Sequence, residues 1–215
     1  MPRSRLVPLL LGIAILLTAC GAPTQKYAAS KSEGVYFTVP NSWHEISMKE
    51  LNAIESKSTA SGAAERLALV KWQQAFTFDK SVTPNRVFSL LAPKVPIAFV
   101  RVRELFPDEV NSVSYNSLRD IVEPITDWVS NPTSSTPVYG IIDDHEVVQK
   151  SARGVRTIYN FTAKGISQTI DHTALVSSDR LKIYVFVIRC TTACYNKNIK
   201  AISRIADSFT VRGAR

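Results

Sequence analysis

Four consecutive segments in the last third of the sequence constrain the fold most. Each is rich in β-branched or aromatic side chains, and turn residues separate them at hairpin-like lengths. They span residues 140–150, 154–163, 168–177 and 181–190. This spacing predicts neighbouring antiparallel strands. The stretch from Leu181 to Ile188 is apolar on both faces except at Lys182, which is typical of a central strand covered on both sides.

Shorter motifs predict the elements that precede and follow these strands. Ser47 followed by Glu50 is a capping box, which marks the beginning of a helix over residues 48–55. Apolar periodicity predicts further helices over residues 67–76, 114–128 and 195–206, and the second of them is expected to kink or restart at Pro124. Strands are also expected over residues 35–39, 87–88 and 95–105. The expected fold class is therefore α+β, an antiparallel β-sheet flanked by helices in an α/β/α sandwich.

The beginning of the chain has the parts of a bacterial lipoprotein signal. Arg3 and Arg5 precede a short apolar stretch, and Leu17-Thr18-Ala19-Cys20 has the pattern of a lipobox, in which the cysteine is lipidated. The apolar stretch is too short to span a bilayer as a helix. The expected organisation is a signal peptide over residues 1–19, a lipidated N-terminus and flexible tether over residues 20–33, and a single domain over residues 34–215.

A lipidated Cys20 would place the protein at the extracytoplasmic face of the cell membrane, with acyl chains such as palmitate in the bilayer. The alternative is an uncleaved signal anchor, or an ordinary secretory signal in which the cysteine is incidental. The formal net charge of +8 could hold the protein near anionic lipids, or it could be a solvated surface. Nucleic acid is not expected as a partner, because the chain is exported and has no basic-aromatic motif.

Two further cysteines, Cys190 and Cys194, remain after lipidation of Cys20. An even pair in an oxidising compartment indicates a disulfide, and residues four apart in a helical turn have Cα atoms close enough for one. Their C-x-x-x-C spacing fits neither a thioredoxin motif nor a zinc knuckle. Two reduced, buried thiols are the alternative.

Two polar clusters are candidate binding sites, and each has a simpler explanation. Asp143 and His145 share one face of a predicted strand, and together with His172 they could bind a divalent metal. Such a run more often forms a solvated edge that prevents strand aggregation. Arg101 and Arg103 also lie two apart on a strand and could clamp a phosphate or carboxylate. Two arginines on a wet face, paired with Glu104 or Asp108, are the simpler explanation.

The two ends of the predicted domain resemble those of PsbP-like domains. Phe37-x-x-Pro40-x-x-Trp43 follows the first strand, and the chain ends with an aromatic-rich strand around Tyr184, an amphipathic helix and Asp207-Ser208-Phe209. The resemblance implies an antiparallel sheet flanked by helices and a non-catalytic accessory or binding role. It carries no functional residue over to this chain. Phe37 and Phe209 are expected to share one core.

The sequence contains no nucleophile elbow, P-loop, H-E-x-x-H or dinucleotide glycine motif. The expected function is that of a lipid-anchored extracytoplasmic binding or accessory protein, without catalytic activity or cofactor, whose partner is another envelope protein. The alternative is a carrier or sensor of a small hydrophobic ligand. Trp43, Trp72 and Trp128 could line an apolar cleft for that ligand, although core packing explains them as well.

Overall fold

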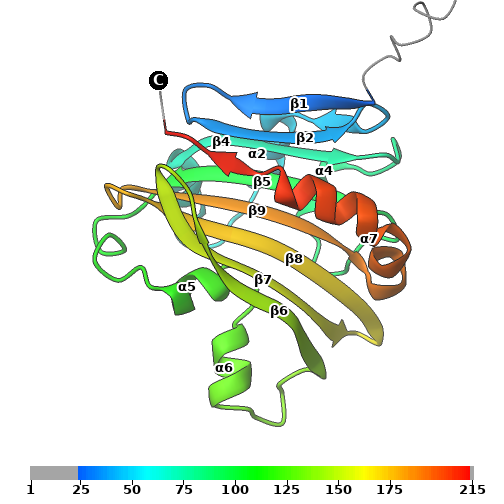
Figure 1. The fold of residues 1–215 in the computed structure, drawn as a ribbon. Coiled ribbons are helices and arrows are strands. Elements are labelled where there is room, and N and C mark those ends of the chain that lie inside the picture. The colour runs from blue at the N-terminus through cyan, green and yellow to red at the C-terminus, as the bar shows by residue number, and fades with distance from the viewer. Residues whose placement is uncertain (1–23, 214–215) are drawn as a thin grey trace, which may run out of the picture.

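The computed structural model describes residues 24–213, which form a seven-stranded sheet, a three-stranded sheet and six helices (Figure 1). The three-stranded sheet is antiparallel and has the order β1-β2-β10. Its strands are β1 (Gln25–Ser30), β2 (Val35–Pro40) and β10 (Thr210–Val211). Within residues 24–213, no helix combines the length and the apolar character needed to cross a bilayer.

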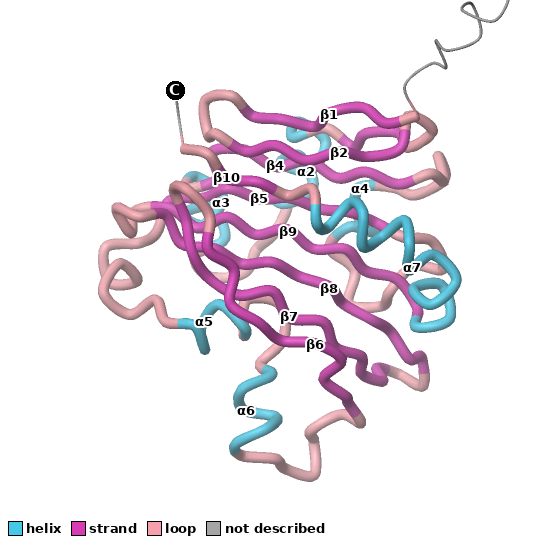
Figure 2. The backbone as a smooth tube through the Cα atoms, in the orientation of Figure 1, coloured by secondary structure: helices cyan, strands magenta, loops and turns pink. Residues whose placement is uncertain are grey.

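The seven-stranded sheet has the order β3-β4-β5-β9-β8-β7-β6, and every neighbouring pair is antiparallel. Its strands are β3 (His44–Ile46), β4 (Val70–Thr77), β5 (Ile97–Glu104), β6 (Tyr139–Val148), β7 (Ala152–Ala163), β8 (Ile166–Ser177) and β9 (Lys182–Thr191). The four strands predicted in the last third of the chain are therefore confirmed as β6 to β9. They follow one another across the sheet as consecutive hairpins (Figure 2).

Strand β9 is the central strand, as its sequence predicts. It lies between β5 and β8, and its residues from Ile183 to Ile188 are all buried. Because side chains alternate along a strand, the two faces of β9 belong to different layers of the core. Tyr184, Phe186 and Ile188 pack into one cluster, whereas Val185 and Val187 pack into another on the opposite face.

One face of the large sheet is covered by the three-stranded sheet and by helix α7 (Thr192–Asp207) (Figure 1). Phe37 from β2 and Phe209 beyond α7 both stack against Phe186, with ring centroids 4.8 and 4.9 Å apart. The expected shared core of Phe37 and Phe209 is thus confirmed. The backbone N–H of Trp43 donates to the carbonyl of Pro40 at 3.0 Å, which turns the chain from β2 towards β3.

The opposite face carries two separate core clusters beneath short helices. One cluster lies under α2 (Met48–Glu55) and α4 (Pro84–Val87), and the other lies under α5 (Tyr115–Arg119) and α6 (Ile125–Ser130). Helix α3 (Ala63–Ala68) has no buried residue. The α+β class, with an antiparallel sheet flanked by helices, is confirmed, and the three-stranded sheet adds to the layer that holds α7.

The helix predicted over residues 48–55 is present with the same bounds, and its capping box is formed by Ser47 and Glu50. The final helix, predicted over residues 195–206, begins three residues earlier, at Thr192. The side chain of Thr191 accepts a hydrogen bond from the backbone N–H of Cys194, so it caps this earlier start. Cys190 and Cys194 form the predicted disulfide, with Cα atoms 5.9 Å apart.

Two helix or strand predictions were wrong. The helix expected over residues 67–76 is the end of α3 followed by strand β4, because residues 70–76 pair with β5. The short strand expected at residues 87–88 is instead the end of one-turn helix α4. Of the two outcomes expected at Pro124, a kink or a restart, the structure shows the restart: α5 ends at Arg119, and α6 begins at Ile125 with Pro124 as its N-cap.

The prediction of a flexible tether over residues 20–33 was also wrong for residues 24–33, the part of it that the structure describes. Residues 25–30 form strand β1, which pairs with β2 from Gln25 opposite Pro40 to Ser30 opposite Val35. Ala28 and Ser30 are buried by this pairing. The signal peptide and Cys20 lie outside the described residues.

Candidate functional site

A cleft of about 410 Å³ lies on the face of the large sheet that carries the short helices. Its floor is formed by β5 and β9, which are hydrogen-bonded neighbours. Apolar side chains dominate this floor, with Ile97 and Phe99 from β5 and Val185 and Val187 from β9. Ligand sites in proteins typically have volumes of about 300–1,000 Å³ and mostly apolar linings, so this cleft has the size and character of one.

The cleft exists because the two core clusters on this face do not meet. Ile97 belongs to the cluster under α2 and α4, whereas Val185 and Val187 belong to the cluster under α5 and α6. One wall is formed by residues 87–90 at the end of α4, and the other by residues 121–123 between α5 and α6. A strip of apolar sheet therefore remains without a helix over it.

Arg189, at the end of β9, is the first of two polar groups that face the cleft without a charged contact partner. Its Nη2 donates to the carbonyl oxygens of Arg86 and Val87, at 3.2 and 3.1 Å, and to that of Ser89. These bonds hold the guanidinium group against the wall of the cleft. Its Nε and Nη1 donate no hydrogen bond to any residue between 24 and 213.

Glu123 is the second such group. It lines the cleft on the wall opposite α4, and within the described part of the chain its carboxyl makes no hydrogen bond or ion pair. Burial raises the pKa of Glu123 above its ordinary value, and the charge of Arg189 partly opposes this shift. A carboxyl with a raised pKa in a cleft is a frequent mark of a functional site.

Tyr159 is a third polar side chain of interest, and it lies in the same cross-strand row of the large sheet as Arg189. It faces Ile170 on β8, which in turn faces Arg189 on β9. The ring is fully buried and its hydroxyl has no hydrogen-bond partner among the described residues. Burial, and then the charge of Glu123, raise the pKa of this hydroxyl. Buried hydroxyls nearly always have a hydrogen-bond partner, so the unpaired Tyr159 hydroxyl is unusual.

Arg101 and Arg103, predicted as a possible anion clamp, are both in ion pairs within the protein. Both side chains reach the cleft, but each is already engaged by acidic or amide groups. Arg101 pairs with Glu55 at 2.6 Å and donates twice to the Gln73 side-chain carbonyl. Arg103 makes a two-pronged contact with Glu109, with bonds of 2.6 and 2.8 Å. Both arginines are paired with acidic side chains, as the simpler explanation has it, but these are Glu55 and Glu109 and not Glu104 or Asp108. The two arginine side chains are only 24% and 19% exposed, so they do not lie on a wet face.

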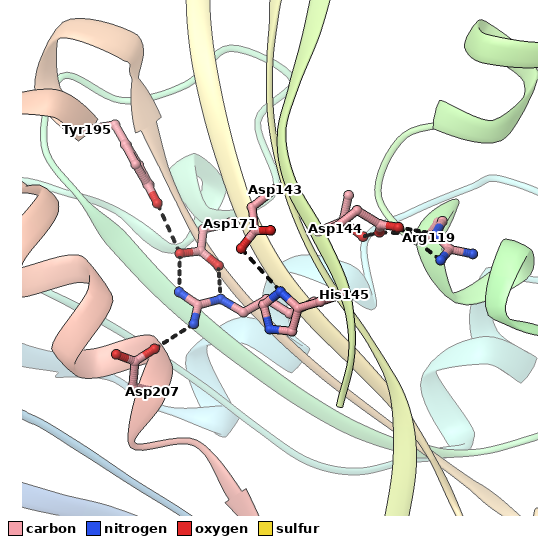
Figure 3. A network of polar contacts seen from close by, with 9 residues as sticks. Arg119, Asp143, Asp144, His145, Asp171, Tyr195 and Asp207 are labelled. Atoms are coloured by element: carbon pink, nitrogen blue, oxygen red, sulfur yellow. Dashed lines mark hydrogen bonds and ion pairs between the residues drawn. The ribbon is translucent and has the colours of Figure 1, made fainter. Parts of the chain in front are cut away.

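The three metal candidates do not converge. Asp143 and His145 contact each other at 3.1 Å on exposed strand β6 (Figure 3), but His172 points to the opposite face of the sheet. His172 is fully buried, and its Nε2 lies 3.3 Å from the carbonyl oxygen of Leu118. Between residues 24 and 213, no group of three or more His, Cys, Asp or Glu side chains could hold a metal ion.

A buried ion pair that the sequence did not reveal lies on the α7 side of the sheet (Figure 3). Asp171 on β8 accepts two hydrogen bonds from Arg156 on β7, at 2.9 and 2.8 Å, and a third from the Tyr195 hydroxyl at 3.0 Å. Arg156 also contacts Asp207 at the end of α7. The network joins β7, β8 and α7 and satisfies the buried carboxylate, which is a structural role.

The tryptophans belong to the core and not to the cleft. Trp43 and Trp72 pack into the cluster under the three-stranded sheet, and Trp128, a residue of α6, points from that helix into the cluster beneath it. All three are buried, and none of them lines the cleft over β5 and β9. The three tryptophans therefore pack in the core, which was the alternative explanation of them, and the apolar cleft is lined by other residues.

Comparisons with known proteins give structural similarity only. No protein-family model and no curated protein sequence matches the chain. Similar solved structures include cyanobacterial PsbP from Synechocystis sp. PCC 6803, with 13% identity, coverage of 91% of this chain and 99% of that chain, and a TM-score of 0.47. LpqN of Mycobacterium tuberculosis, described as involved in cell envelope biogenesis, has 10% identity, 98% coverage of both chains and a TM-score of 0.46.

The Ran-binding protein Mog1p of Saccharomyces cerevisiae is a third similar structure, with 11% identity, coverage of 88% of this chain and 96% of that chain, and a TM-score of 0.46. A PsbP is thus among the similar structures. Identities of 10–13% and TM-scores below 0.5 do not assign a function, which has to be judged from the site itself.

Proposed function

We propose that this protein is a non-catalytic binding protein of the cell envelope, and that the cleft over β5 and β9 binds a small, mostly apolar ligand. The observation that carries the proposal is the cleft with its apolar floor, bordered by two polar groups, Arg189 and Glu123, that have no charged contact partner among residues 24–213. An apolar cavity with a few convergent polar groups is the usual design of a small-molecule site.

The proposed location is the extracytoplasmic face of the cell membrane, with Cys20 as the lipid anchor. The lipobox at Leu17-Thr18-Ala19-Cys20 supports this location. The disulfide between Cys190 and Cys194 is in keeping with it, because such bonds persist in oxidising compartments. A ligand taken up at this place would come from the envelope or the adjacent bilayer.

Filling the cleft tests the proposed function. Val122 lies on the wall of the cleft and is only partly buried, so Val122→Trp should occupy the cleft without disrupting the core. We expect this variant to lose binding of anilinonaphthalene sulfonate, a fluorescent apolar probe. Ile199→Trp on the outer surface of α7 is the matched control and should keep it. Equal probe binding by both variants would contradict the proposal.

A second candidate function, docking of another envelope protein, is favoured by an exposed apolar patch at α6 and β6. Val129, Val138, Ile141 and Ile142 are 59%, 82%, 43% and 54% exposed, and all four lie between α6 and the beginning of β6. Exposed apolar clusters often mark protein interaction sites. Photocrosslinkers placed at residues 129 and 142 should then capture one defined envelope protein in intact cells, whereas a crosslinker at residue 199 should not.

A further inference from the structure

We infer that the polar end of the cleft recognises a carboxamide, so that the ligand is a small amphiphile with an amide head and an aliphatic tail. This inference rests on the proposed function and names the chemistry of its ligand. The inference follows from the ion pairs around the cleft and from Arg189 and Glu123, the two charged lining residues that take part in none of them.

The charges around the cleft are almost all neutralised within the protein. Arg101 is paired with Glu55, and Arg103 is paired with Glu109. The hydrogen bond from Arg103, opposed by burial, holds the pKa of Glu109 below its usual range, so this carboxylate stays charged near neutral pH. The remaining charged groups that line the cleft are Arg189 and Glu123, one of each sign. An anionic ligand therefore meets no net positive field.

Arg189 is a fixed hydrogen-bond donor. Its Nη2 is held by the carbonyl oxygens of three residues at the end of α4, so the guanidinium plane has little freedom to turn. A group that is already ordered before binding loses little conformational entropy when the ligand arrives. Its remaining N–H groups suit one acceptor oxygen of the ligand.

Glu123 supplies the complementary acceptor. It lies in the same cleft as Arg189 and feels its charge, but the two side chains are not in ion-pair contact in the described structure. A ligand that joins them must therefore present an acceptor to Arg189 and a donor to Glu123. A carboxamide does so, because its oxygen accepts and its nitrogen donates.

Other simple head groups leave one of the two protein groups unsatisfied. A carboxylate can accept from Arg189 but offers no donor to Glu123, and an ammonium group can donate to Glu123 but offers no acceptor to Arg189. An alcohol offers a single O–H donor on the same oxygen that must accept, whereas a carboxamide offers two N–H groups and a separate oxygen with two lone pairs. A buried polar group without its partner costs about 1–3 kcal/mol, which is about a tenfold to hundredfold loss of affinity.

The apolar part of the cleft accommodates the tail. Phe99, Val185 and Val187 form the floor next to Arg189, and Ile121 lies on the wall beside Glu123. Val185 and Val187 are already buried, whereas Phe99, Ile121 and Val122 are half-buried, so an aliphatic chain would cover the apolar surface that these three leave exposed. Burial of such surface is favourable by about 25 cal/mol per Å².

Four probes that share an octyl-type chain test the inference: octanamide, octanoate, octylamine and octanol. Each is titrated into the purified full chain by displacement of anilinonaphthalene sulfonate at neutral pH. We expect octanamide to bind about tenfold or more tightly than each of the other three. Displacement by all four with equal affinity would overturn the inference and leave the proposed function standing. Failure of all four to displace the probe would count against the proposed function and the inference together.

Glu123→Gln gives a second, independent readout. The substitution removes the negative charge and supplies an N–H group, so octanoate should gain affinity relative to octanamide by about tenfold. A merely structural role of Glu123 would weaken both probes alike. Asp143→Asn, which changes an exposed carboxylate on β6 outside the cleft lining, should leave the ratio of the two affinities unchanged. An unchanged ratio in Glu123→Gln would overturn the inference.

Discussion

His172 should make the folded protein sensitive to acid, because a neutral imidazole is buried in the core. Its Nε2 lies 3.3 Å from the carbonyl oxygen of Leu118, which it approaches as a donor when the ring is neutral. Its Nδ1 is buried and has no hydrogen-bond partner in the described structure. Protonation of the ring would place an uncompensated positive charge at Nδ1. Burial lowers the pKa of His172 from 6.5 to about 4, although Asp171, Asp144 and Asp120 oppose the shift.

The sign and size of the effect follow from this pKa. Between pH 6.5 and 4 the unfolded chain binds a proton at His172 that the folded chain does not bind. The free energy of unfolding therefore falls as the pH decreases through this window. A shift of one pKa unit is worth about 1.36 kcal/mol, so the loss that His172 causes should approach about 3 kcal/mol at pH 4.

Urea denaturation followed by tryptophan fluorescence between pH 7 and pH 4 measures this loss. His172→Gln is the matched variant, because glutamine keeps an N–H donor for the Leu118 carbonyl but does not titrate. Carboxylates such as Asp144 titrate in both proteins, so the difference between the two pH profiles isolates His172. We expect the variant to lose about 3 kcal/mol less than the parent on acidification. Parallel profiles would refute the reasoning.

Three further predictions concern the network on the α7 side, the disulfide and the anchor. Tyr195→Phe removes one hydrogen bond to the buried carboxylate of Asp171 and should lower the free energy of unfolding by about 1–3 kcal/mol in urea; no loss would show that this bond adds nothing. Cys194→Ser opens a small disulfide loop and should cost about 2 kcal/mol, and free thiols in the freshly isolated parent would contradict the bond. Cys20→Ala should abolish labelling by a clickable fatty acid, and undiminished labelling would rule out lipidation at this cysteine.

The strands in the last third of the chain could be predicted because local sequence determines them. Turn residues separate the apolar and β-branched segments that form β6 to β9. Each of these strands pairs with the strand next to it in the sequence. The capping box of α2 is equally local, since Ser47 and Glu50 contact each other directly.

Elements that depend on distant partners were predicted less well. Strand β4 is buried on both faces between β3 and β5, so its apolar residues do not alternate and their spacing imitates a helix. Strand β1 has no apolar run of its own, and it forms because β2 offers an edge for pairing. In both cases tertiary pairing outweighs the local pattern.

The candidate site was the least predictable part. Arg189, Glu123 and the residues at the end of α4 come from three distant stretches of the chain, and the register of the sheet is needed to bring them together. Arg101 and Arg103 drew attention because they are neighbours in sequence, yet their ion pairs with Glu55 and Glu109 depend on the fold. The one signal available was Arg189 itself, a charged residue at the end of an otherwise apolar central strand.

A methyl NMR titration with octanamide tests most directly whether the cleft over β5 and β9 is a ligand site. The account predicts that the methyl signals of Ile97, Val185 and Val187, on the cleft floor, shift in a saturable way, while that of Ile199 on α7 stays in place. Shifts confined to Val129 at the exposed patch, or no saturable shift on the cleft floor, would contradict it.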